Sequence, residues 1–177
     1  MPNIIDLVEN SGAIKRGKFK LSNGKLTDYY IDKYAFETDP AILSKIAAAI
    51  SEQIPGGDID VVAGPELGAI PLVTAVSLEC KVAAAYVRKG EKHQGTQARI
   101  EGSIGKGDRV VVVEDVSTTG GTILETAQLV EEAGGIVEQL IVVVDRNEGA
   151  VENVHDHGYE LEYLVQIGED YDVVSPE

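Results

Sequence analysis

The feature that most restricts the fold is a series of strand-length apolar runs that alternate with segments of helical spacing. The runs are IDVVAG, KVAAAYV, RVVVVED, IVEQLIVVVD and YELEYLV, at residues 59–64, 81–87, 109–115, 136–145 and 159–165. Helical segments follow two of them, at 69–80 and 122–135. Strands that are apolar almost throughout belong in sheets covered on both faces, and helical connections give parallel order. The sequence therefore predicts an α/β fold with a central, mostly parallel sheet flanked by helices.

The N-terminal part has different signals. Residues 2–12 have apolar positions at helical spacing and end at Gly12. Residues 19–36 are expected to form two short strands around Ser22, Asn23 and Gly24, because Asn-Gly is a strong hairpin signal. Asp39 is then expected to cap a helix with Pro40 at its first position. The acidic tail from Gly168 is expected to be frayed.

Length and composition indicate one soluble domain. A chain of 177 residues with 44% hydrophobic residues can bury one core. The lone Cys80 and a start without a signal-peptide pattern predict a reducing cytoplasm. The apolar runs are too short for a membrane span, so no membrane association is expected.

The formal net charge of −15 argues against nucleic acid as a partner, because nucleic-acid binding needs a basic face. High ionic strength would screen the self-repulsion of such a chain, so we hypothesise a halophilic source; an ordinarily acidic mesophile protein is the alternative. Six of the basic residues fall within 15–33 and four within 88–99. Basic clusters in so acidic a chain suggest an anionic ligand.

The most specific motif is EDVSTTGGT at 114–122. Its hydroxyls and its two glycines, at the start of a helix, suit a phosphate group. Glu114 and Asp115 would repel phosphate, so they are expected to meet sugar hydroxyls or a ligand-bound metal ion. Each residue alone can also be explained as a helix cap or a solvated acid. Together they favour a phosphorylated ribose as the ligand.

This stretch resembles the phosphoribosyl pyrophosphate (PRPP) signature of type I phosphoribosyltransferases, an apolar strand, an acid pair and a hydroxyl-glycine turn. The resemblance implies that family's fold, with an N-terminal hood at 1–36 and a mobile catalytic loop at 88–108 within one domain, 1–177. It implies that PRPP is bound by Arg88, Lys89, Lys92, Glu114, Asp115, Val116, Ser117, Thr118, Thr119, Gly120, Gly121 and Thr122.

Within the family, the loop YVRKGEKHQG resembles that of orotate phosphoribosyltransferases, as do LSNGKLTDYYID, VAGPELGAIPL and VVVDRNEGA. The resemblance implies transfer of the phosphoribosyl group of PRPP to N1 of orotate, with Lys92 as the catalytic loop residue. Thr118 and Arg146 would bind orotate, and Asp145 would orient Arg146. Mg²⁺ would be carried by PRPP, without protein ligands. A homodimer that shares the loop across its interface is also implied.

The sequence departs from that pattern at several positions. Gln94 takes the place of the loop histidine, and His93 lies one position early; Gly68 and Ser22 stand where some members carry lysine. Tyr29 and Tyr30 can cover the pyrimidine ring or simply pack. His155 and His157 fit a surface helix end better than a metal site.

Two alternative functions remain open. A purine or uracil phosphoribosyltransferase would share the PRPP turn, but would lack the arginine for the orotate carboxylate. A PRPP-sensing transcriptional regulator would usually add a helix-turn-helix, for which the 18 residues before Phe19 are too few.

Overall fold

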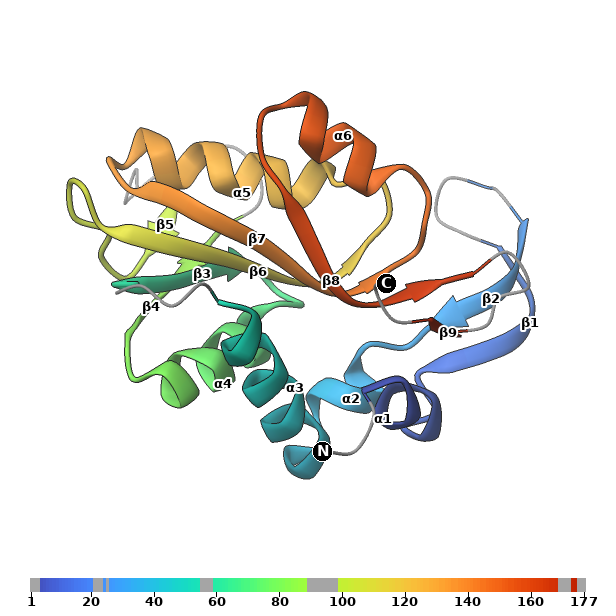
Figure 1. Ribbon diagram of the computed structural model, residues 1–177. Helices are drawn as coiled ribbons and strands as arrows, with labels where there is room; N and C mark the ends of the chain where they lie inside the picture. Colours follow the sequence, from blue (N-terminus) through green and yellow to red (C-terminus); the bar gives the residue numbers. More distant parts are fainter. Residues whose placement is uncertain are drawn as a thin grey trace.

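The protein is built on a seven-stranded sheet in the order β5-β4-β3-β6-β7-β8-β9 (Figure 1). The computed structural model describes residues 4–20, 24, 26–54, 59–88, 99–168 and 173–174. The strands of the sheet are β3 (Val61–Pro65), β4 (Ala83–Val87), β5 (Ile100–Glu101), β6 (Arg109–Ser117), β7 (Ile136–Asp145), β8 (Leu161–Ile167) and β9 (Val173–Val174). Neighbouring strands are parallel except at the edges, where β5 and β9 are antiparallel. The expected α/β class is confirmed.

Helices cover both faces of the sheet, as Figure 1 shows. One face carries α1 (Ile4–Asn10), α2 (Tyr34–Glu37), α3 (Pro40–Gln53) and α4 (Ile70–Cys80), and the other carries α5 (Gly121–Glu132) and α6 (Ala150–Asp156). Along β6, Val111 and Val113 belong to the first core, and Val110 and Val112 to the second. Because successive side chains of a strand point to opposite faces, a strand between two cores is apolar throughout.

The N-terminal segment forms a separate antiparallel pair, β1 (Ile14–Lys20) with β2 (Leu26–Ile31). The predicted pair of strands is therefore confirmed, but β1 begins at Ile14, before the expected segment, and residues 34–36 belong to α2. Of the predicted turn, Ser22 and Asn23 lie outside the described residues. Asp39 caps α3, as expected, by accepting hydrogen bonds from the backbone N–H groups of Ala41 and Ile42. The division of the chain into a hood and a mobile loop stays a prediction.

Two details differ from the sequence expectations. β6 continues two residues beyond Asp115, because Val116 and Ser117 still pair with Val144 and Asp145 of β7. The tail is ordered in part, since Val173 and Val174 pair with the end of β8, so the expectation of a fully frayed end was wrong. His155 and His157 lie at the exposed end of α6, as expected.

None of the helices in the described part of the chain has the length and apolar character that crossing a membrane requires. The cytoplasmic location suggested by Cys80 stays a prediction.

The sheet order places the carboxyl ends of β3 and β6 side by side. Along the chain, β3 is the first strand of this sheet. The next strand, β4, lies on one side of β3, and β6 lies on the other. In open parallel sheets, a crevice forms at the carboxyl ends of the strands where the order reverses. The carboxyl ends of β3 and β6 therefore define where a ligand site is expected.

Candidate active site

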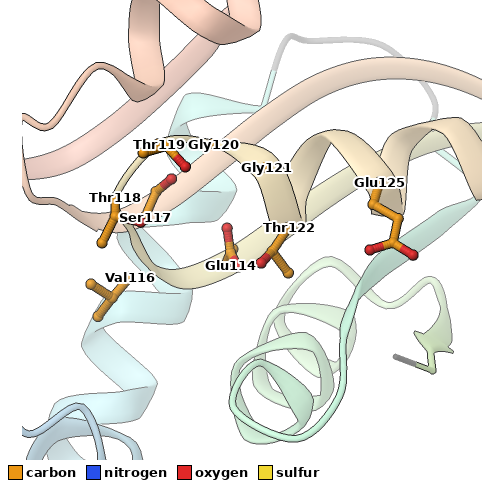
Figure 2. A pocket seen from close by; sticks show the side chains of 9 residues that line it. All are labelled: Glu114, Val116, Ser117, Thr118, Thr119, Gly120, Gly121, Thr122 and Glu125. Atoms are coloured by element: carbon orange, nitrogen blue, oxygen red, sulfur yellow. The ribbon is translucent and has the colours of Figure 1, made fainter. Parts of the chain in front are cut away.

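A polar hollow of about 250 Å³ lies where β6 passes into α5 (Figure 2). It is lined by Glu114, Val116, Ser117, Thr118, Thr119, Gly120, Gly121, Thr122 and Glu125. All of these except Glu125 belong to the residues expected to bind PRPP. Glu125 comes from the second turn of α5, and no sequence motif pointed to it beyond its spacing from Thr122.

The turn presents the N-terminal end of α5 to the hollow. Gly120 is the N-cap, with φ of 76°, and no side-chain hydrogen bond caps the helix within the described residues. A Cβ on Gly120 would lie 2.9 Å from Val154 Cγ2, whereas a Cβ on Gly121 would meet nothing closer than Thr119 Oγ1 at 3.9 Å. Gly120 is therefore needed by the fold, and Gly121 leaves open space. Helix N–H groups without a cap are suited to an anion.

The neighbouring elements hold this turn in place. The backbone N–H of Arg146 donates to Ser117 O at 2.9 Å, and Asn153 Nδ2 donates to Thr119 O at 2.6 Å. The Ser117 hydroxyl is buried and has no hydrogen-bond partner within the described part of the chain. A braced turn with an unsatisfied hydroxyl is preorganised for a polar ligand.

The two acids at the end of β6 point in different directions. Glu114 lines the hollow, while Asp115 lies on the other face and accepts a hydrogen bond of 2.5 Å from Lys33 Nζ. Asp115 also accepts from the backbone N–H of Val116 at 2.7 Å. Burial alone lowers the pKa of Lys33, but the contacts with Asp115 outweigh it and hold the pKa above its usual value. Lys33 is therefore an ammonium at neutral pH.

Glu37 completes a buried charged cluster with Lys33 and Asp115. It is only 3% exposed, and neither carboxylate oxygen has a hydrogen-bond partner among the described residues. Burial, together with the nearby charge of Asp115, raises the pKa of Glu37 to about 8, although Lys33 opposes this shift. Sequence reasoning missed Lys33 and Glu37, because Lys33 lies 82 positions from Asp115 in the chain and nothing in the sequence links them.

Arg146 is held against the N-terminal segment. Its guanidinium carbon lies 4.6 Å from the ring centre of Tyr29, and its Nε donates to the Tyr29 hydroxyl at 3.0 Å. Nε also lies 2.9 Å from Glu148 Oε1, and the arginine side chain is 9% exposed. Because these contacts use Nε, the two terminal nitrogens can still pair with a carboxylate.

The remaining residues of this end of the sheet have structural roles. Asp145 accepts from Gln166 Nε2 and from the backbone N–H of Asn147, so it shapes the turn that carries Arg146. Burial raises the pKa of Asp145, and these two hydrogen bonds partly offset the effect.

Tyr30 is 44% exposed and lies near Phe19, with ring centres 5.7 Å apart. Of the two tyrosines, only Tyr29 contacts a predicted site residue.

Arg88 marks the start of the basic loop. Its Nη1 donates to Glu101 Oε1 at 3.3 Å, and its Nε lies 4.0 Å from Glu66 Oε2. At the other end of the loop, Arg99 donates to Glu125 Oε1 at 2.5 Å, next to the hollow. Lys89, Lys92, His93 and Gln94 lie outside the described residues. Arg99 thus links the described end of this loop to a residue that lines the hollow.

Few side chains of the site could bind a metal ion directly. No group of three or more His, Cys, Asp or Glu side chains in the described ranges is arranged to hold a metal ion. Glu114 and Glu125 nevertheless place carboxylate oxygens in the hollow. Mg²⁺ commonly takes one or two carboxylates together with substrate phosphates, so the residues present fit an ion that a ligand brings.

Known proteins resemble this chain in sequence and in structure. The family described as phosphoribosyl transferase domain matches residues 35–164, which include every residue that lines the hollow. An orotate phosphoribosyltransferase of Methanothermobacter thermautotrophicus is 45% identical over 166 residues, which cover 94% of this chain and 91% of that protein. The crystal structure of orotate phosphoribosyltransferase from Aeropyrum pernix has a TM-score of 0.81 at 32% identity, covering 93% of each chain. The Mycobacterium tuberculosis orotate phosphoribosyltransferase in complex with PRPP has a TM-score of 0.76 at 31% identity, covering 93% of this chain and 96% of that one.

The raised pKa of Glu37 predicts a specific pH dependence of stability. The folded protein holds the proton up to about pH 8, whereas the unfolded chain releases it near 4.5, so Glu37 makes the free energy of unfolding fall as pH rises between these values. Glu37→Gln removes this titration. The free energy of unfolding of the variant minus that of wild type should therefore rise by roughly 2–4 kcal/mol from pH 5 to pH 9. Urea unfolding at pH 5, 7 and 9 measures the difference; parallel pH profiles for the two proteins would contradict it.

Proposed function

Since the chain belongs to the phosphoribosyltransferase family, we propose that it transfers the 5-phosphoribosyl group of PRPP to N1 of orotate. The fold expected from the sequence, that of type I phosphoribosyltransferases, is confirmed by the family match and the structural neighbours. The products are orotidine 5′-monophosphate and pyrophosphate, and the reaction is a step of UMP synthesis. The observation that carries the proposal is the anion-binding turn after β6 with Arg146 beside it, at the end of β7.

The turn after β6 takes the 5-phosphate of PRPP. The hydroxyls of Ser117, Thr119 and Thr122 and the uncapped N–H groups of α5 supply the hydrogen bonds. Glu114 and Asp115 then accept from the ribose hydroxyls at the end of the strand. The unpartnered Ser117 hydroxyl, among the described residues, supports this assignment because the phosphate would satisfy it.

Orotate binds beside the turn, where Arg146 pairs with its carboxylate. A guanidinium suits this role because it can donate two parallel hydrogen bonds to a carboxylate. Thr118 follows Ser117, and Arg146 follows Asp145, which is the β7 partner of Ser117. The two orotate-binding residues therefore stand at neighbouring strand ends, which supports a shared subsite. Tyr29 positions Arg146 rather than covering the pyrimidine ring.

The chemistry separates charge between the ribose and the leaving pyrophosphate. Positive charge develops at the anomeric carbon, and negative charge gathers on the pyrophosphate. The configuration at the anomeric carbon is inverted. Arg88, Lys89 and the catalytic Lys92 stabilise that leaving group as the loop closes over it. Mg²⁺ bound through PRPP supplies further positive charge to the phosphates.

Three further features belong to the proposal. The loop of one protomer completes the site of the other in a homodimer. The protein works in the cytoplasm. The net charge of −15 suits a source with high internal salt, where counterions screen the repulsion among acidic residues.

Orotate consumption tests the activity directly. With PRPP and Mg²⁺, orotate absorbance should fall, and uracil or hypoxanthine in its place should not react. Lys92→Ala should lower kcat by about 10²–10³-fold, the usual effect of removing one group that stabilises developing charge. Lys45→Ala, on the exposed surface of α3, is the control and should keep full activity. No PRPP-dependent loss of orotate, at low or molar salt, would refute the assignment.

The two glycines of the turn should respond to alanine in opposite ways. Gly120→Ala should lower the free energy of unfolding by about 1–3 kcal/mol, because of the positive φ and the contact with Val154. Gly121→Ala should change stability by less than about 0.5 kcal/mol. Its methyl group would fill space meant for phosphate, so KM for PRPP should rise about tenfold or more. Urea unfolding and initial rates measure both effects. Normal PRPP affinity in Gly121→Ala would place the phosphate elsewhere.

Arg146 and Tyr29 should affect orotate and leave PRPP binding unchanged. Arg146→Ala should raise KM for orotate about a hundredfold, in keeping with loss of a buried charge pair. Tyr29→Phe keeps the ring under the guanidinium and removes the hydrogen bond, so its effect should be smaller than that of Tyr29→Leu. Initial rates at varied orotate and at varied PRPP separate the two substrates. Equal effects of Tyr29→Phe and Tyr29→Leu would show that the ring contact contributes nothing.

A further inference from the structure

Lys33 carries its charge from the N-terminal segment into the crevice between β3 and β6. The residue stands between β2 and α2, and its ammonium reaches Asp115 at the end of β6. The side chain of Asp115 is 6% exposed, whereas that of Lys33 is 30% exposed. The side chain of Lys33 therefore has a buried partner and is itself still partly exposed to solvent.

The Lys33–Asp115 pair fills the place of a missing side chain. Gly68 lies in the loop after β3, and a Cβ built on it would be 1.8 Å from Lys33 Nζ and 2.1 Å from Asp115 Oδ2. The φ of Gly68 is not in the left-handed region, so the backbone itself does not require glycine there. What requires glycine is the ion pair. The ammonium of Lys33 thus stands where a side chain of residue 68 would begin.

This position is adjacent to the part of PRPP that leaves in the reaction. With the 5-phosphate in the turn after β6 and the ribose at Glu114 and Asp115, the pyrophosphate on the anomeric carbon extends away from the turn. The neighbouring loop in that direction follows β3, the strand beside β6, and it contains Gly68. The ammonium stands between that loop and Asp115.

The charges around this point make a cation necessary. Asp115 contributes a carboxylate at this point, and without Lys33 it would oppose an approaching polyphosphate. An ammonium has three donors, so Lys33 can keep Asp115 and donate to a phosphate oxygen at the same time.

We propose that Lys33 is a further PRPP-binding residue, which presents its ammonium to the pyrophosphate group through the space left by Gly68. This inference rests on the proposed function, because it takes PRPP as the ligand of the crevice. It assigns to the N-terminal segment a direct part in holding the leaving group, and it gives Gly68 a reason to lack a side chain.

Three variants test the inference: Lys33→Met, Lys33→Arg, and Lys15→Met as the matched control. Lys15 also pairs with an aspartate, Asp32, at 2.7 Å, but lies outside the crevice. KM for PRPP, KM for orotate and kcat are measured, together with the dissociation constant of Mg²⁺-pyrophosphate by calorimetry and the melting temperature.

Lys33→Met should weaken PRPP and pyrophosphate binding by about tenfold or more, the usual scale for a charged hydrogen bond, while KM for orotate stays within about twofold. Lys33→Arg should retain most of the affinity. Lys15→Met should match wild type.

A structural salt bridge would behave differently. If Lys33→Met lowers the melting temperature but leaves pyrophosphate affinity within twofold of wild type, the inference is overturned. Failure of the proposed function is seen separately, as absence of orotate consumption by the wild-type protein.

Discussion

The burial of two carboxylates at the end of β6 is the constraint around which the site is organised. Glu114 and Asp115 are each 5% exposed, and a charge so far from water must be compensated. Because neighbouring residues of a strand face opposite sides, the two acids meet different surroundings. Glu114 reaches the hollow beside α5, and Asp115 reaches Lys33. Glu114 thus lines the hollow, and Asp115 connects the sheet to the N-terminal segment.

An acidic chain that binds a polyanion has to place its few cations accurately. Each described cation near the crevice is held by an acidic partner: Lys33 by Asp115, Arg88 by Glu101, Arg99 by Glu125 and Arg146 by Glu148. Such pairs fix the position of the positive group and lower the local net charge.

The sequence was most informative where a pattern is local. The bounds of the strand at 136–145 and the identity of the Asp39 cap were predicted correctly, because each depends on neighbours in the chain. The motif at 114–122 was enough to identify the hollow. It could not show that Asp115 faces away from that hollow. It also could not show that β6 continues to Ser117, because that depends on pairing with β7.

The contacts that no pattern revealed join distant segments. Lys33 with Asp115 and Tyr29 with Arg146 are separated by 82 and 117 positions in the chain. Glu37 gave no signal at all, since a carboxylate buried without a partner in the described structure violates the usual rule for acidic residues. Such violations depend on the assembled fold and cannot be read from composition or spacing.

The N-terminal segment touches both halves of the site within five residues. Tyr29 holds the arginine at the end of β7, and Lys33 holds the acid at the end of β6. Both lie on one short piece of chain, so a shift of that piece alters both contacts together. The hairpin is therefore joined to the sheet at two strand ends at once, and its position sets the place of one cation at each of them.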